Sequence, residues 1–351
     1  MGHVVLVTGV ARPLGRRLAA LLHSAPDVDR IIGVDVVPPT TPVDPNGRIE
    51  FVRADIRNPV IGKVIAAADV DTVVHLSVAT TPRGGARRAA MKEINVIGTM
   101  QLLAACQKAP SVRRLIVKSS TSVYGCSPRD PALFTEDMEP QETPRSGYAK
   151  DAVEVEGYVR GFARRRPNVG VTTLRMANIL SADADSEFAS YFALPVLPTV
   201  LGFDPRLQFL HEDDALEALR RSILERHLGI YNVAGAGILL LSQAARRLGK
   251  PTLPVPTRAL GMLGVLLRQA GVTDISVEQL QLFTFGRAVD TTRLREAFGW
   301  APARSTAAAF DDFAAAHHAG GPITPDRVAL VESAVENAVH DVVATVRGGR
   351  A

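Results

Sequence analysis

A glycine-containing turn near the N-terminus has the composition of a phosphate-binding site. Residues 4–7 form a continuous aliphatic run typical of a buried strand, and apolar spacing typical of a helix begins at Leu14. Between them, Gly9 permits a tight turn and Gly15 allows the helix to pack closely on the strand. The helix N-terminus can then offer backbone N–H groups to a pyrophosphate. The turn therefore predicts dinucleotide binding.

Two acidic residues stand where a dinucleotide would need them. Asp35 ends the second predicted strand, 20 residues after Gly15, where a carboxylate can accept hydrogen bonds from both ribose hydroxyls of an adenosine. Asp55 ends the third predicted strand and is suitably placed for the adenine amino group. Because a carboxylate at Asp35 would repel a 2′-phosphate, it favours NAD over NADP.

Strands alternate with helices along the first half of the chain. Short aliphatic and β-branched runs at 31–34, 49–52, 72–76 and 115–117 are separated by helical stretches. This alternation predicts an α/β fold: a Rossmann-type doubly wound parallel sheet with a smaller C-terminal substrate-binding lobe. We expect an NAD(P)-binding Rossmann domain over 1–180, returning Rossmann elements mixed with the substrate lobe over 181–320, and an amphipathic helix over 321–351.

Composition argues against several other classes of protein. The chain has 40 Lys+Arg and 36 Asp+Glu, a net charge of +4, and its arginine clusters lack interleaved aromatic residues, so nucleic-acid binding is not expected. Cys106 and Cys126 have no matching histidine cluster, which argues against a metal site or a disulfide and favours a reducing cytoplasm. The chain starts without an export signal, and the apolar stretch 259–267 is about half of what a membrane span requires.

The C-terminal segment is expected to form one more helix. From Pro325 onward, valines recur at helical spacing with charged residues between them, and the proline suits a first helical position. The simplest interpretation is a helix that docks on its own domain. A dimer contact and a peripheral membrane contact are the alternatives.

Ordered motifs along most of the chain resemble the extended short-chain dehydrogenase/reductase superfamily, and within it the NAD-dependent epimerase/dehydratase family that includes UDP-galactose 4-epimerase. HLSV at 75–78 resembles the family's HLAA segment, EINVIGT at 93–99 its N-V-x-G-T helix, and SSTSVYG at 119–125 its S-S-x-x-V-Y-G segment. Further matches are LRMAN at 174–178, FLHEDD at 209–214, YNV at 231–233, DTTRL at 290–294 and FGW at 298–300.

This resemblance implies an active site and a set of binding residues. Tyr148 would act as general base or acid toward a substrate hydroxyl or carbonyl, and Ser120 would hydrogen-bond the same oxygen. A small-molecule substrate would be contacted by Ser120, Thr121, Asn178 and Arg206. The helices around Asn95 and Tyr148 would form a homodimer contact. The cofactor would be contacted by Gly9, Arg12, Leu14, Gly15, Asp35, Asp55, Ile56, His75, Leu76, Ser77, Asn95, Ser119 and Tyr148.

Arg12 departs from the family pattern at the cofactor turn. The family motif is TGxxGxxG, and Arg12 stands at its middle glycine. An arginine in this turn can contact the 2′-phosphate in short NADP-dependent members, whereas Asp35 points to NAD; the resemblance therefore implies NAD, with NADP as the alternative. Arg12 would pair with Asp35, with a pyrophosphate oxygen, or with a surface carboxylate in an ordinary salt bridge.

The family's catalytic pair is incomplete in this chain. A lysine four residues after the tyrosine lowers the pKa of the tyrosine in this family, but Ala152 occupies that position. Lys150 cannot substitute, because two residues along a helix turn a side chain by about 200° whereas four return it to nearly the same face. The replacement cation would be the oxidised nicotinamide, Lys118 or Arg145.

The substrate side departs from the pattern too. Family members that act on sugar nucleotides place a diphosphate-binding arginine at the position of Leu207; here Arg206 is one residue earlier, on the other face of a strand. Arg287 lies near the position of a second such arginine. Three functions stay open: an NAD(P)-dependent oxidoreductase or epimerase-like enzyme, a dinucleotide-binding sensor or scaffold that has lost catalysis, and a reductase or isomerase of a steroid- or lipid-like alcohol.

Overall fold

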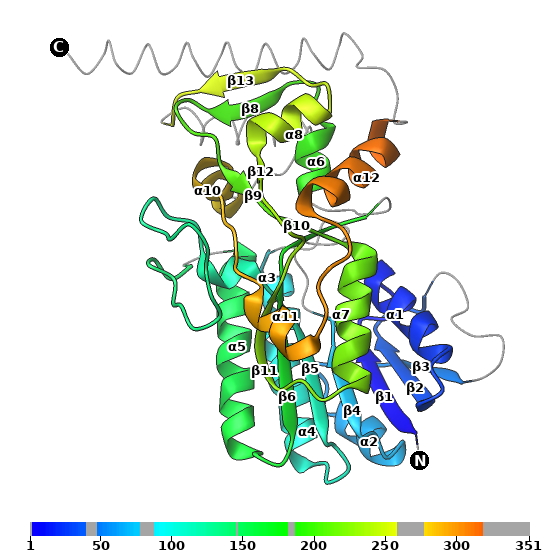
Figure 1. Ribbon diagram of the computed structural model, residues 1–351. Coiled ribbons are helices and arrows are strands. Elements are labelled where there is room, and N and C mark those ends of the chain that lie inside the picture. The colour runs from blue at the N-terminus through cyan, green and yellow to red at the C-terminus, as the bar shows by residue number, and fades with distance from the viewer. Residues whose placement is uncertain are drawn as a thin grey trace.

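A parallel sheet of seven strands lies at the centre of the protein. The computed structural model describes residues 2–39, 48–77, 88–144, 147–181, 187–257 and 277–318. Within them the strand order is β11-β6-β5-β4-β1-β2-β3 (Figure 1), and every neighbouring pair is parallel. The strands are β1 (His3–Thr8), β2 (Val28–Asp35), β3 (Ile49–Arg53), β4 (Thr72–His75), β5 (Arg114–Ser120), β6 (Gly170–Met176) and β11 (Gly229–Val233).

This order has a functional consequence. The chain adds strands outward from β1 to β3, then returns to add β4 on the other side of β1. Ligands of doubly wound sheets bind at such a reversal, at the carboxyl ends of the strands. The predicted Rossmann-type sheet is confirmed, and its strand order predicts a ligand crevice above the carboxyl ends of β1 and β4.

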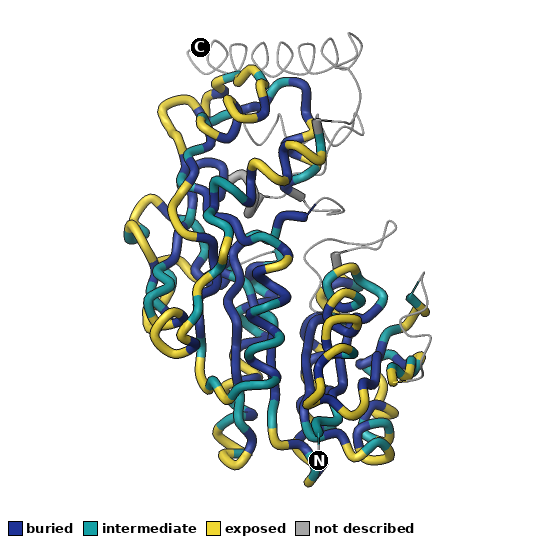
Figure 2. The backbone as a smooth tube through the Cα atoms, turned by 45° about the vertical axis from the view of Figure 1, so that its right-hand side comes forward, coloured by how far each residue is buried: buried dark blue, intermediate teal, exposed yellow. Residues whose placement is uncertain are grey.

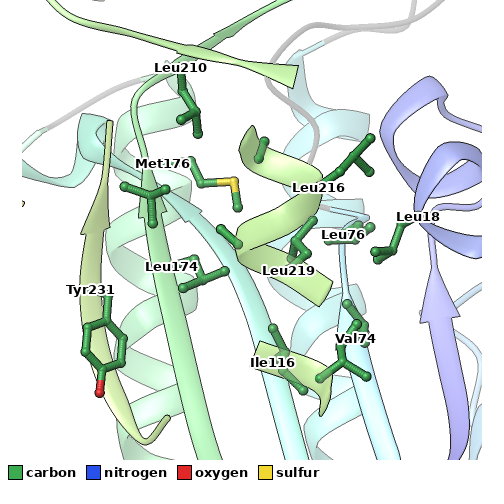
Figure 3. Packing of buried hydrophobic residues seen from close by; sticks show 14 of the residues in the cluster. Leu18, Val74, Leu76, Ile116, Leu174, Met176, Leu210, Leu216, Leu219 and Tyr231 are labelled. Atoms are coloured by element: carbon green, nitrogen blue, oxygen red, sulfur yellow. The ribbon is translucent and has the colours of Figure 1, made fainter. Parts of the chain in front are cut away.

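Helices cover both faces of the sheet because its strands are apolar on both sides. On one face, α1 (Pro13–His23) and α7 (Glu212–Leu224) pack with Leu18, Leu216 and Leu219 toward Ile116 of β5 (Figure 3). On the other face lie α2 (Val60–Ala67), α4 (Gly98–Lys108) and α5 (Gly147–Arg165). Figure 2 shows the strands buried between helices whose outer sides are exposed.

A smaller lobe sits beyond the carboxyl edge of the sheet (Figure 1). Its core is largely aromatic: Tyr191 stacks on Phe283 with ring centroids 3.9 Å apart, and Phe192 meets Phe310 edge to face at 5.1 Å. Two short strand pairs, β7 (Asn178–Leu180) with β10 (Phe209–His211) and β9 (Arg206–Leu207) with β12 (Leu239–Leu240), connect it to the sheet. The lobe contains α6 (Glu187–Ala193), β8 (Leu197–Val200), α8 (Leu241–Arg247), β13 (Thr252–Val255), α10 (Val277–Phe285) and α12 (Thr306–His318).

The remaining elements are short. Helix α3 (Arg88–Lys92) runs through a π-helical turn, Glu93–Ile97, into α4; a 3-10 turn, Thr121–Tyr124, follows β5; and α11 (Thr292–Phe298) packs beside β11. Among the described residues, no helix is long and apolar enough to cross a membrane. The apolar stretch 259–267 and the helix expected from Pro325 onward lie outside the described residues.

Candidate active site

The glycine turn forms a tight cradle at the start of α1. Gly9 has a φ of +81°, in the left-handed region that glycine adopts without strain. A methyl group on Gly15 would lie 2.3 Å from the carbonyl oxygen of Gly9, so no larger residue fits there. The helix begins at Pro13, with Arg12 as N-cap. Close backbone packing and a helix N-terminus that points into the crevice fit a pyrophosphate.

Asp35 and Asp55 lie just beside this cradle, at the ends of β2 and β3. The Asp35 carboxylate accepts hydrogen bonds from the backbone N–H groups of Ala11 at 3.0 Å and Val36 at 2.8 Å, which fixes it next to the turn. Asp55 is bound by the Arg57 guanidinium at 2.6 Å, which holds the pKa of the Asp55 carboxyl below its usual range. Asp35 is thus placed for an adenosine ribose, whereas Asp55 already has a cationic partner.

His75 ends β4 within a buried chain of hydrogen bonds. Its Nδ1 lies 3.0 Å from Thr8 Oγ1 and its Nε2 lies 2.9 Å from Thr99 Oγ1. The same Thr8 oxygen accepts from the backbone N–H groups of Leu76 and Ser77. Burial lowers the pKa of His75 to about 4, so the ring is neutral at pH 7. These residues hold β1 and β4 together beneath the crevice.

Tyr148 reaches the carboxyl end of β5 from the first turn of α5. Its hydroxyl oxygen is buried and has no hydrogen-bond partner among the residues that the structure describes. Burial raises the pKa of Tyr148 far above its ordinary value; Ser120 is close enough to oppose this shift, although the two hydroxyls do not meet hydrogen-bond geometry. Ser120 Oγ itself accepts from the backbone N–H of Ser122 at 3.1 Å. The structure therefore brings the two predicted catalytic hydroxyls together.

The helix that carries Tyr148 offers no cation in the family's position. Ala152 is 2% exposed and packs in the core. Lys150 is half exposed and lies 4.0 Å from Glu154, which confirms that it does not replace the lysine. Asn95, in the π-helical turn, is fully buried and donates its amide to Asp151 of α5 at 3.0 Å. Such turns are frequent at functional sites, and this one braces α5 one turn after Tyr148.

Two cations approach the inner end of the crevice. The charge of Arg12 contributes to the lowered pKa values of His75 and Lys118 and opposes the raised pKa of Tyr148, so its guanidinium lies near all three. Burial first, and Arg12 second, lower the pKa of Lys118 to about 8. Sequence reasoning considered both residues separately and did not predict that the charge of one acts on the other, because that depends on the folded sheet.

Three residues predicted to contact the cofactor have side chains that contact other parts of the protein. Leu14 packs against the hydrophobic cluster under α1, and Ile56 is buried against Gly98. The Ser119 hydroxyl donates to Glu156 of α5 at 2.5 Å. Since neighbouring residues of a strand point to opposite faces, Ser119 turns its side chain away from the crevice while Ser120 faces it.

Glu156 also anchors a buried ion pair. The Arg175 guanidinium of β6 lies 2.7 Å from a Glu156 carboxylate oxygen, and both side chains are almost completely buried. Arg175 donates further to the Tyr124 hydroxyl at 2.8 Å. The arginine of the L-R-x-x-N segment thus ties β6 to α5 and to the segment after β5, on which the position of Ser120 depends.

The predicted substrate side is defined by Thr121 and two arginines. Arg287 donates to Thr121 Oγ1 at 3.3 Å and to the carbonyl oxygen of Gly125 at 3.1 Å. Its backbone N–H donates to the carbonyl oxygen of Arg206 at 2.9 Å. Asn178, at the start of β7, is half-buried. The structure thus brings the backbones of Arg206 and Arg287 together, a contact that sequence reasoning did not predict.

Both arginines line a cleft of about 280 Å³ between the loop after β5 and the smaller lobe. The Asp130 carboxyl also faces it; one carboxyl oxygen is buried without a hydrogen-bond partner among the described residues, and burial raises the pKa of this group. Aromatic rings complete the wall. Lining residues include Ser127, Asp130, Phe134, Phe203, Arg206 and Arg287.

His211 has a structural role. Its Nδ1 accepts a hydrogen bond from the backbone N–H of Asp213 at 3.2 Å, as the N-cap of α7. Asp214 accepts from the backbone N–H groups of Ala303 and Arg304 at 2.7 and 3.1 Å. Through these contacts the FLHEDD segment caps α7 and fixes the loop before α12. Among the described residues, no cluster of His, Cys, Asp and Glu side chains could hold a metal ion.

Comparison with known proteins shows which family this chain resembles in sequence. Residues 5–234 match the NAD dependent epimerase/dehydratase family. The "Uncharacterized protein Rv0501" of Mycobacterium tuberculosis (strain ATCC 25618 / H37Rv) is 47% identical over 327 residues, which cover 93% of this chain and 87% of that protein.

Solved structures share the fold. The dTDP-glucose 4,6-dehydratase of Bacillus anthracis, solved in complex with NAD, has a TM-score of 0.68 at 19% identity and covers 91% of this chain and 97% of its own. The UDP-glucose 4-epimerase of Thermotoga maritima, solved with UDP-glucose, has a TM-score of 0.67 at 19% identity, with 90% and 99% covered.

The family match extends over well more than half of the chain and runs from the first strand to the last strand of the sheet. It agrees with the cofactor that Asp35 favours, because the family is NAD dependent. The cradle at Gly9 and Gly15 and the orientation of Asp35 fit that cofactor on geometric grounds. This chain belongs to the NAD dependent epimerase/dehydratase family.

Proposed function

We propose that the protein is an NAD-dependent oxidoreductase or epimerase-like enzyme that acts on a hydroxyl or carbonyl group of a sugar derivative. The observation that carries this proposal is the Tyr148 hydroxyl, which is buried beside Ser120 at the inner end of a dinucleotide crevice and has no hydrogen-bond partner among the described residues. A buried polar group left unsatisfied is costly. A substrate oxygen placed between Tyr148 and Ser120 would satisfy it.

The chemistry follows from these two hydroxyls. When bound, NAD⁺ supplies a hydride acceptor at its nicotinamide. Tyr148, as phenolate, would take the proton of the substrate hydroxyl while the carbon beneath loses its hydride, so that the alcohol becomes a carbonyl. Ser120 would donate a hydrogen bond to the same oxygen and hold it in place. In the reverse direction Tyr148 returns the proton to the carbonyl oxygen.

We propose that the cleft lined by Arg206 and Arg287 receives the part of the substrate beyond the reacting carbon. Arg287 is held by Thr121, the residue after Ser120, so a bound group there would lie next to the catalytic hydroxyls. Arginines favour phosphate or carboxylate groups. One solved structure with this fold is named as a dTDP-glucose 4,6-dehydratase and another contains UDP-glucose, which supports a nucleotide sugar as first candidate.

The test separates binding from chemistry. Tyr148→Phe should leave NAD affinity within about twofold, because it removes only the hydroxyl, and should abolish turnover of UDP-glucose, UDP-glucuronate or dTDP-glucose, whichever the parent converts. Lys150→Met, on the outer side of the same helix, serves as the control and should retain turnover. Retained turnover in Tyr148→Phe would contradict the assigned role of Tyr148.

One observation favours a second candidate, a dinucleotide-binding sensor. With Ala152 in the core and the pKa of Tyr148 raised by burial, the isolated site is poorly equipped to ionise the tyrosine. A sensor would bind NAD and respond to its redox state without converting a substrate. In that case NAD affinity would persist while every substrate of the panel stayed unchanged in the parent protein.

A further inference from the structure

Strand β5 carries a lysine on the face that leads to the catalytic hydroxyls. Ile116 packs in the core beneath α1 and α7, whereas Val117 packs in the core on the opposite face. Because side chains alternate along a strand, Lys118 shares the face of Ile116 and Ser120. Its Cα lies two residues before that of Ser120, about 7 Å along the strand, a separation comparable to the length of a lysine side chain.

Lys118 and Tyr148 are complementary groups without partners. Lys118 is half-buried, and its ammonium makes no hydrogen bond or ion pair with any residue of the described ranges. The buried Tyr148 hydroxyl lacks a hydrogen-bond partner as well. Lys118 shares the strand face of Ser120, whose hydroxyl is close to that of Tyr148, and the charge of Arg12 affects the pKa values of both Lys118 and Tyr148.

We propose that Lys118 is the positioning residue for Tyr148: from strand β5 it supplies the cation that the family places on α5 at the position of Ala152. The inference rests on the proposed function, in which Tyr148 exchanges a proton with the substrate. The buried methyl group of Ala152 leaves the α5 side without a charge, whereas Lys118 lies on β5 two residues before Ser120 and on the same strand face.

The charges around Lys118 connect this role to cofactor binding. Arg12, from the start of α1, disfavours the ammonium form of Lys118, and His75 on β4 is neutral. On α5, Glu156 and Asp151 oppose ionisation of Tyr148. A pyrophosphate bound at the start of α1 would neutralise Arg12. The pKa of Lys118 would then rise, and Lys118 would be fully charged when the cofactor is present.

The experiment measures the ionisation of Tyr148 in the NAD⁺ complex. Near-ultraviolet absorbance of the phenolate is followed against pH, with Tyr148→Phe subtracted, for the parent, Lys118→Met, Lys150→Met and the double variant Lys118→Met/Ala152→Lys. Methionine keeps the length of the side chain and removes its charge, so folding is preserved. NAD affinity is measured for each protein by calorimetry.

We expect Tyr148 to ionise below about pH 10, the ordinary tyrosine value, in the parent complex. Lys118→Met should raise the midpoint by about one pH unit or more, Lys150→Met should leave it unchanged, and Ala152→Lys should restore it. Equal midpoints in the parent and Lys118→Met, or no ionisation of Tyr148 up to pH 10 in the parent complex, would overturn the inference while the proposed function stands. Failure of the parent to bind NAD would overturn both.

Discussion

His75 links the cofactor crevice to the stability of the chain. The folded protein keeps this ring neutral, with a pKa of about 4, whereas an unfolded histidine has a pKa near 6.5. As pH falls from about 6.5 to 4, the unfolded chain binds a proton that the folded chain refuses, so the folded state loses up to about 3 kcal/mol from this group. Stability from this source is fully present above pH 6.5.

His75→Gln should therefore make the free energy of unfolding depend less on pH below pH 7. An amide can still bond the hydroxyls of Thr8 and Thr99 but takes up no proton in this range. Urea denaturation between pH 7 and 4.5 would show a smaller loss of unfolding free energy than in the parent. His317→Gln, at a half-buried position of α12, should keep the parental slope. Parallel slopes in the parent and His75→Gln would rule out this account.

At the scale of the element, the turn between β1 and α1 depends on one missing methyl group. Gly15→Ala would place a methyl 2.3 Å from the carbonyl oxygen of Gly9, and the turn must open to accept it. We expect a loss of about 2 kcal/mol in unfolding free energy and at least tenfold weaker NAD binding. Gly157→Ala in α5 meets nothing within 4 Å and should be neutral or stabilising by up to about 1 kcal/mol. An unchanged NAD affinity in Gly15→Ala would contradict the assigned role of this turn in NAD binding.

The buried ion pair between Arg175 of β6 and Glu156 of α5 gives the second prediction for an element. Glu156→Gln leaves the Arg175 guanidinium buried without its carboxylate, which should cost about 3–5 kcal/mol. Glu154→Gln, two residues earlier on the more exposed side of α5, should cost less than about 1 kcal/mol. Chemical denaturation compares the two variants directly. Similar losses in both would show that the buried pair is not the dominant contact.

How much of this was predictable from sequence also differs between elements. The strands at 4–7, 31–34, 49–52, 72–76 and 115–117 were predicted because each is a local apolar run, and the structure confirms them. Long-range contacts were not predictable. Arg287 meets Thr121 across 166 residues, and the direction of Arg12 toward Tyr148 depends on how α1 and α5 sit on the sheet. No local pattern encodes either contact.

At the scale of the whole molecule, the central sheet and the aromatic lobe contribute different parts of the site. The sheet places the glycine cradle, Asp35 and the hydroxyls of Ser120 and Tyr148 along its carboxyl edge, while the aromatic lobe provides one wall of the cleft at Arg206. The reversal of strand order at β1 explains why residues as distant in sequence as Asp35 and Tyr148 border one crevice. We therefore expect a bound cofactor to contact several of the predicted residues at once.

The most direct measurement of that claim is calorimetry of NAD(H) and NADP(H) binding to the purified protein, after extraction of any copurified cofactor. Because the Asp35 carboxylate is fixed beside the turn and would repel a 2′-phosphate, NAD should bind at least about tenfold more tightly than NADP, a difference of about 1.4 kcal/mol. Asp35→Asn should narrow that ratio. Preference for NADP(H), or no binding of either dinucleotide, would contradict the account.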